Sequence, residues 1–142
     1  MTESSLPVRR GGVEQIFAGD AVIAIIVRLN AAMAETTFVT EPEASLQLGL
    51  IVYPQGGEVP RHTHRPLDRR LMGTAEVLFV RSGRCEVDLY DDDRRFVAAR
   101  ELATGDVIVL LSGGHGFRML EDTVLAEVKQ GPYPGVDEKE RF

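Results

Sequence analysis

Short extended runs separated by turn residues recur along the chain from about residue 8 onward. Apolar and polar positions alternate within several of these runs. In Arg84–Tyr90, for example, Cys85, Val87 and Leu89 share one face, and mainly charged residues occupy the other. Such alternation is typical of antiparallel strands that have one face in the core and one in solvent. The pattern predicts an all-β domain.

Turn residues such as Gly, Asp and Ser separate the runs at intervals of about 8–12 positions, which is the spacing of β-sandwiches and β-barrels. The expected strands are Val13–Phe17, Ala21–Leu29, Thr37–Val39, Ser45–Tyr53, Val59–His64, Glu76–Arg81, Arg84–Tyr90, Arg95–Leu102, Asp106–Leu111, His115–Leu120 and Thr123–Gln130. Two short stretches of helix are expected as well, over Asn30–Glu35 behind an Asn cap and over Pro66–Leu71 behind a proline.

Two runs of unusual composition have ordinary structural explanations. The most apolar run, Ala21–Val27, is seven residues long. A membrane-spanning helix needs about 20 apolar residues, so this run is expected to be a buried strand, and no membrane partner is expected. The acidic run Asp91–Asp93 is expected to be a hairpin turn and not a cation site.

Length, charge and cysteine content narrow the classes of protein. A chain of 142 residues suits a single domain over 1–142, with residues 1–7 disordered and residues 131–142 forming either a disordered tail or an ordered arm anchored by Tyr133. The net charge of −6 argues against a nucleic-acid partner. The one cysteine, Cys85, excludes an intramolecular disulfide and is expected to be a buried thiol. Without disulfides or a signal-peptide pattern, a cytoplasmic location is expected.

The three histidines of the chain carry its candidate chemistry. His62 and His64 are separated by one residue in an expected strand, so both imidazoles project from the same face and can share one ion. Glu76 and His115 each begin a later strand. Three imidazoles and a carboxylate form a mixed nitrogen and oxygen site, which suits Fe, Mn, Zn, Ni or Cu ions and not Ca²⁺ or Mg²⁺. Such a site leaves a coordination position open for catalysis.

These residues stand at the spacings of a known family. Five residues separate Gly56 from His62, and six separate Glu76 from Gly83. The chain resembles the two motifs of the cupin superfamily over residues 56–119, the first with Gly56, His62, His64, Glu76 and Gly83 and the second with Gly105, Gly113 and His115. The resemblance implies a small single-domain cupin, which is an antiparallel double-stranded β-helix (jelly-roll barrel), with His62, His64, Glu76 and His115 as metal ligands.

The resemblance leaves the acidic ligand open. Eleven residues separate His64 from Glu76, more than the motif has, and Asp68 stands at the usual offset. Glu76 is favoured because its spacing to the following glycine fits and because it begins an apolar strand. Asp68 then belongs to an arginine-rich loop over the site. In the second motif Leu111 and Met119 replace the usual Pro and Asn, so a site of three histidines without a carboxylate is the other alternative.

Substrate contacts are expected from residues around the same centre. Phe117 and Met119 follow His115 with a period of two, so they should line the barrel beside the metal. The candidate substrate-binding residues are Tyr53, Arg65, Phe117, Met119 and Gln130. The candidates for neutralising a bound carboxylate or phosphate are Arg61, Arg65 and Lys129. The candidates for a general base are Glu76 and Tyr53.

Three functions remain open at this point. The first is a metal-dependent enzyme that acts on a small anionic molecule, as an oxygenase, an isomerase or a sugar-modifying enzyme. The second is a non-catalytic module that binds a small ligand, and the third is an oligomeric scaffold with a structural metal. The expected cofactor is one divalent transition metal, Fe, Mn, Zn or Ni. The resemblance to small cupins implies pairing through sheet edges, so a homodimer is expected.

Overall fold

Three antiparallel sheets organise residues 8–135 and 138–142, the part of the chain that this computed structural model describes. The strands are β1 (Val8–Arg10), β2 (Val13–Ala18), β3 (Ala21–Val27), β4 (Thr37–Phe38), β5 (Gly49–Leu50), β6 (Glu76–Ser82), β7 (Arg84–Tyr90), β8 (Phe96–Ala103), β9 (Val107–Leu110), β10 (Gly114–Met119) and β11 (Val124–Lys129). The predicted all-β class is confirmed. Residues 1–7, for which disorder is predicted, lie outside the described residues.

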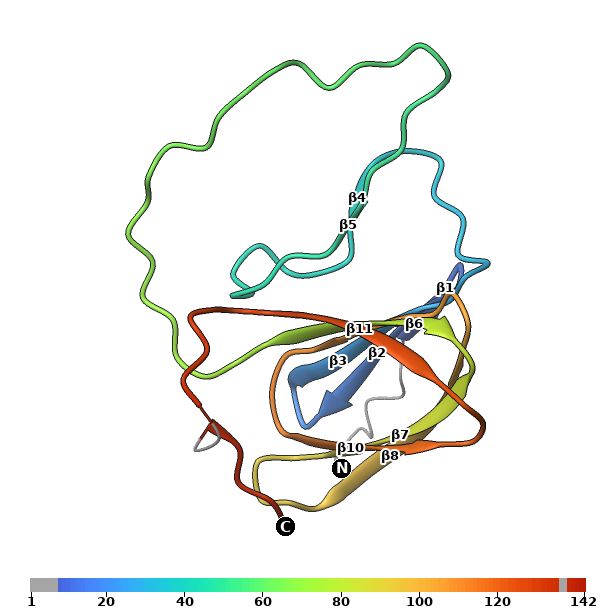
Figure 1. Ribbon diagram of the computed structural model, residues 1–142, viewed down its shortest axis with the longest axis vertical. Helices are drawn as coiled ribbons and strands as arrows, with labels where there is room; N and C mark the ends of the chain where they lie inside the picture. Colours follow the sequence, from blue (N-terminus) through green and yellow to red (C-terminus); the bar gives the residue numbers. More distant parts are fainter. Residues whose placement is uncertain (1–7, 136–137) are drawn as a thin grey trace.

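The two larger sheets face each other as the layers of a sandwich (Figure 1). One has six strands in the order β1-β2-β3-β9-β6-β11, and the other has three in the order β10-β7-β8. β4 and β5 pair only with each other among the described strands. Within residues 8–135 and 138–142, hydrogen bonding does not close the sheets into a barrel. The same ranges contain no helix long and apolar enough to cross a bilayer.

The main core lies between the two layers. Alternate residues of β7, namely Cys85, Val87 and Leu89, are buried there. They belong to one cluster with Ile26 and Ile108 of the six-stranded sheet. The inward face predicted for this strand is therefore confirmed. Burial raises the pKa of the Cys85 thiol, which keeps it protonated, as expected for a structural residue.

A second core covers the outer face of the six-stranded sheet. Ile25 and Val27 of β3 and Val109 of β9 are buried there, and Leu46 and Leu48 of the segment between β4 and β5 pack against them. β3 is thus covered on both faces, which is why its run is apolar throughout and does not alternate. The prediction of a buried strand at this position is confirmed.

Asp106 ties the turn between β8 and β9 to the end of β3. The residue is 7% exposed. Its Oδ1 accepts the backbone N–H of Leu29 at 2.9 Å, and its Oδ2 accepts the backbone N–H of Ala103 at 2.9 Å and Arg28 Nη1 at 3.0 Å. Both oxygens are therefore used as acceptors, which is the arrangement that an ionised carboxylate satisfies and an amide does not.

Asp106→Asn is expected to lower the free energy of unfolding by about 1–3 kcal/mol, because the amide NH₂ then faces a backbone donor on whichever side it points. Urea denaturation measures the change. The matched control is Asp92→Asn in the exposed turn after β7, which is expected to change stability by less than about 0.5 kcal/mol. Equal stability of the two variants would contradict this role for Asp106.

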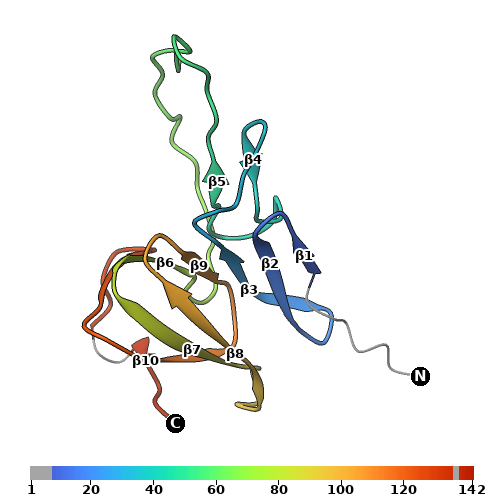
Figure 2. The same ribbon diagram turned by 90° about the vertical axis from the view of Figure 1, so that its right-hand side faces the viewer.

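Residues 51–74, here called the arm, leave β5 and return to β6 without joining a sheet of the described residues (Figure 2). Every residue of the arm is exposed. The strand predicted over Val59–His64 and the helical turn predicted over Pro66–Leu71 are therefore wrong for this structure. The physical reason is the same for both: no strand or core within residues 8–135 and 138–142 packs against them, and so short a helix is not stable by itself.

Of the other predictions of secondary structure, one helix is wrong, one strand is much shorter than expected, and the remaining strands are confirmed. The short helix expected over Asn30–Glu35 is absent, and this segment instead leaves β3 through a turn in which the N–H of Ala31 bonds to the carbonyl of Arg28. The strand expected over Ser45–Tyr53 is reduced to β5, because the chain departs from the sheet where the arm begins. The remaining predicted strands are present with their ends shifted by a residue or two, and β1 is a strand that the pattern does not predict.

Candidate metal centre

Glu76 and His115 meet in the gap between the two layers. Glu76 is the first residue of β6, and His115 lies near the start of β10. His115 pairs with Leu89 across the sheet, so its side chain shares the inner face on which Leu89 is buried. Glu76 Oε2 lies 3.3 Å from His115 Nε2, and their side chains are 9% and 32% exposed. Two of the predicted ligands, which lie on different strands and in different sheets, thus meet in the fold.

The carboxyl group of Glu76 is held in its ionised form. The hydrogen bond with His115 is the main cause that lowers its pKa, and the charges of His115 and Lys129 and contact with Glu127 act in the same direction. Burial opposes the shift but does not outweigh it. An ionised, nearly buried carboxylate beside an imidazole can bind a divalent cation without first losing a proton.

Residues near the C-terminus complete the surroundings of Glu76. Lys129 of β11 is its direct neighbour across the sheet. Lys129 Nζ donates to Glu138 Oε2 at 3.4 Å, and the hydroxyl of Thr74 donates to Glu138 Oε1 at 2.7 Å. The Lys129 ammonium also lies 5.6 Å from the centre of the Tyr133 ring. Glu138 therefore connects Thr74, at the end of the arm, to β11. It also forms an ion pair with Lys129, the lysine beside Glu76.

Residues 138–142 lie against the sandwich. The Phe142 ring meets the Tyr90 ring edge to face at 5.1 Å, and the Arg94 guanidinium lies 5.2 Å from the centre of the Phe142 ring. Arg94 also pairs with Glu140 at 2.9 Å. Phe142 is therefore the residue of this segment that contacts β7. Residues 136 and 137 lie outside the described part of the chain.

His62 and His64 lie next to each other on the arm. Their ring centres are 5.2 Å apart. His62 Nδ1–H donates to the carbonyl of Pro60 at 2.8 Å, which leaves Nε2 of the neutral imidazole with its lone pair available. The structure thus brings the four predicted ligands together as two pairs. It does not assemble all four, since the described residues contain no group of three or more His, Cys, Asp or Glu side chains placed to hold a metal ion.

The candidate substrate-binding residues are also divided between the sandwich and the arm. Phe117 packs against the inner core with its ring centre 6.0 Å from that of His115, and Met119 is half exposed on the same strand. Tyr53 and Arg65 are exposed on the arm, as is Asp68, the rival acidic ligand. Phe117 and Met119 therefore lie on the strand of the predicted centre, and Tyr53, Arg65 and Asp68 lie with the other pair of histidines.

Gln130 has a structural role that the sequence does not reveal. Its Oε1 accepts the backbone N–H of Ala75 at 2.8 Å, and its Nε2 lies 3.4 Å from Ser45 Oγ. Ala75 is buried and directly precedes Glu76. Gln130 thus fixes the point at which the arm enters β6, and both ends of its amide are engaged within the protein. It is a support for the centre rather than a ligand contact in this conformation.

Gln130→Ala is expected to lower the free energy of unfolding by about 1–3 kcal/mol, because the N–H of Ala75 loses its acceptor in a partly buried position. The matched control is Gln55→Ala on the exposed arm, expected to change stability by less than about 0.5 kcal/mol. Thermal or urea denaturation measures both. A Gln130→Ala variant as stable as the control would show that this contact is dispensable.

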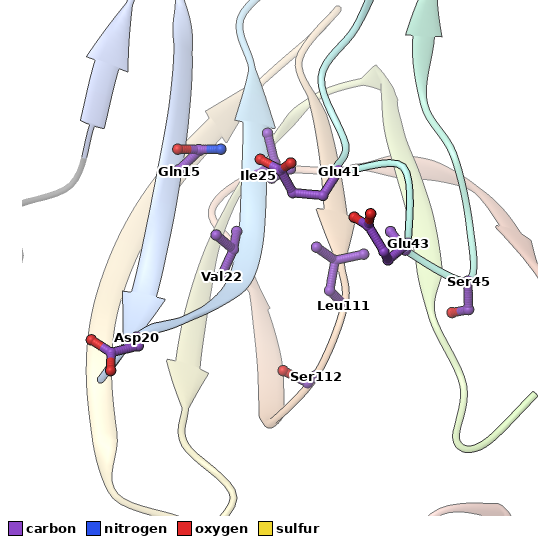
Figure 3. A pocket seen from close by; sticks show the side chains of 10 residues that line it. Gln15, Asp20, Val22, Ile25, Glu41, Glu43, Ser45, Leu111 and Ser112 are labelled. Atoms are coloured by element: carbon purple, nitrogen blue, oxygen red, sulfur yellow. The ribbon is translucent and has the colours of Figure 1, made fainter.

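A separate hollow of about 420 Å³ lies on the outer side of the six-stranded sheet (Figure 3). Its floor is apolar and includes Val22, Ile25 and Leu111, and its rim carries Asp20, Glu41 and Glu43. Ile25 belongs to the outer core and Glu76 to the inner side of the sheet. The hollow is therefore not part of the candidate metal centre. The sequence pattern does not predict it, because the residues that line it come from segments far apart in the chain.

No protein-family model, no curated protein and no solved structure matches the chain. Its functional assignment therefore rests on its own residues and on the geometry described above.

Proposed function

We propose that this protein is a cupin-type metal-binding protein that holds one divalent transition metal through His62, His64, Glu76 and His115 and acts on a small anionic molecule. The observation that carries the proposal is the contact of 3.3 Å between Glu76 and His115 inside the sandwich. Two residues with 38 others between them in the sequence meet there in a partly buried place, with their side chains in direct contact. Surface ion pairs rarely have this placement.

The chemistry of the donor atoms supports a transition metal. Imidazole nitrogen and one carboxylate are the donors of Fe, Mn, Zn and Ni sites, whereas Ca²⁺ and Mg²⁺ prefer oxygen alone. His62 already has the tautomer that a ligand needs, because its Nδ1–H is bound to the carbonyl of Pro60. The spacing of 5.2 Å between the His62 and His64 rings suits two ligands of one ion. When bound, the metal supplies an electrophilic centre with a position open to a small molecule.

The two pairs of ligands join when the arm adds to the free edge of β10. β10 ends the three-stranded sheet, so its second edge has no partner strand among the described residues. A strand paired there presents alternate residues to the inner face, and that face already carries His115. Residues 62 and 64 then lie beside His115 with residue 63 turned away. The addition also widens the narrow sheet to four strands, in keeping with a jelly-roll fold.

An anionic substrate fits the side chains that accompany the ligands. Arg61 and Arg65 flank the two arm histidines and are exposed, so they arrive at the centre together with the metal ligands. Lys129 is already engaged by Glu138. Phe117 and Met119 supply an apolar wall on β10. An apolar wall with a few charged groups is the usual lining of a site for a small molecule, and oxygenase, isomerase or sugar-modifying chemistry is compatible with it.

The wild-type protein is expected to bind about one equivalent of Co²⁺ or Zn²⁺ per chain, measured by calorimetry and by elemental analysis after gel filtration. Three variants are expected to bind the metal more weakly: Glu76→Gln, His115→Ala, and the double variant His62→Ala with His64→Ala. Loss of a residue that only hydrogen-bonds to a metal ligand weakens binding by about 10- to 100-fold. Loss of a ligand itself should weaken it by more. Chelator should lower the melting temperature of the metal-loaded wild type and leave these variants unchanged.

Two control variants sharpen the result. Glu101→Gln removes an exposed carboxylate of β8 and is expected to leave metal affinity unchanged. Asp68→Asn tests the other acidic candidate: a loss of binding there, with Glu76→Gln unaffected, would exchange the two assignments. A wild-type protein that takes up no stoichiometric transition metal would show that the proposed function is wrong.

A further inference from the structure

The arm exposes several large apolar side chains to solvent. All of residues 51–74 are exposed. Seven large apolar side chains are among them, with exposed fractions from 37% to 86%: Ile51, Val52, Tyr53, Val59, Leu67, Leu71 and Met72. Figures 1 and 2 both show the arm as a long excursion away from the two layers. Exposed apolar side chains in this number indicate a surface that another part of the protein or another molecule covers.

The backbone of the arm also lacks strand partners. It contains one turn, in which the N–H of Gly57 bonds to the carbonyl of Pro54 at 3.0 Å. At its base the N–H of Val52 bonds to Thr36 Oγ1 at 3.0 Å. No strand of the described residues pairs with it. An extended segment with unpaired N–H and C=O groups is ready to add to an open sheet edge.

The surface that fits the arm is the open side of the sandwich at β10. The six-stranded sheet faces only three strands, and β10 is the last of these. Its inner residues His115 and Met119 remain partly exposed as a result. An added strand gains backbone hydrogen bonds along β10 and covers these two side chains at the same time. The arm and this edge are therefore complementary in both hydrogen bonding and apolar character.

Electric charge favours the same contact. The arm holds four arginines and two acidic residues, so it carries a net charge of +2. Because the whole chain carries −6, the rest of the chain carries −8. A basic segment is thus attracted to the acidic body of a second copy of the chain. The start of the arm is bonded to Thr36, which directly precedes β4, and Ala75, directly after the end of the arm, is bonded to Gln130, while the middle of the arm extends away from the two layers (Figure 1).

We propose that the arm docks on a second copy of this chain, with residues 59–64 pairing with the free edge of β10 of that copy. Each metal centre then combines Glu76 and His115 of one copy with His62 and His64 of the other. Two such exchanges are related by a twofold axis and close into a homodimer. This inference rests on the proposed function for the role of the histidines, but the docking of the arm is measurable without any metal.

The test is complementation between two variants that each lack one half of the centre. One chain carries His62→Ala and His64→Ala, and the other carries Glu76→Gln and His115→Ala. The two are co-expressed with different affinity tags and purified through both tags, so only mixed dimers remain. The mixed dimer is expected to bind about one Zn²⁺, half of the wild-type content, because the intact arm of one chain meets the intact core of the other. Each variant alone should bind none.

The outcomes separate this inference from the proposed function. A mixed dimer without zinc, beside a wild type that holds two, would show that each centre is built within one chain and would overturn the exchange. A wild type that binds no zinc would overturn the proposed function, and light scattering would then decide the exchange. A wild-type protein that is monomeric at every concentration, with or without bound zinc, would overturn the exchange.

A second experiment isolates the apolar contact of the arm. Leu67→Ser on the arm is expected to raise the dimer dissociation constant by about tenfold or more, measured by sedimentation or light scattering without metal. The matched control is Leu29→Ser, because the two leucines have nearly equal exposed fractions of 67% and 71% and only Leu67 lies on the arm. Equal dissociation constants for the two variants would show that the arm does not form the interface.

Discussion

The six-stranded sheet has to bury both of its faces, and the rest of the structure depends on this constraint. Its inner face packs against the three-stranded sheet, and its outer face is covered by the loop that carries Leu46 and Leu48. Burial of apolar surface is the dominant favourable contribution to folding. It makes β3 and β9 the central strands, because they are covered on both sides. Asp106 then fixes the turn that joins the two sheets to the end of β3.

The unequal width of the two layers creates the candidate centre. β6 lies near one end of the broad sheet, and β10 is the last strand of the narrow one. Glu76 and His115 therefore face each other where no further strand of the described residues covers them. A carboxylate can remain ionised in this nearly buried place because His115 and Lys129 offset the loss of hydration. On this side of the sandwich β10 also leaves a sheet edge without a partner among the described strands.

The arm has the properties that this gap requires. It contributes the two remaining histidines, flanked by arginines, on an extended backbone that has no strand partner of its own. Apolar side chains distributed along it, such as Leu67 and Met72, are exposed for the same reason. In the proposed dimer, metal binding is linked to association, since the segment that completes the proposed centre is the segment that covers the open edge. Affinity for the metal would then depend on protein concentration.

The sequence by itself determined the all-β class, the position of most strands, the inward face of β7 and the burial of β3. These follow from alternation and run length, which are local properties of the chain. It also singled out His62, His64, Glu76 and His115 as candidate ligands of one metal ion. Only the tertiary structure decided that Glu76 and His115 meet while His62 and His64 lie apart from them, that Gln130 supports β6, and that residues 51–74 stand apart as an arm. The strand expected at Val59–His64 needs a partner edge, and pairing between distant segments depends on register and sheet order, which no local pattern encodes.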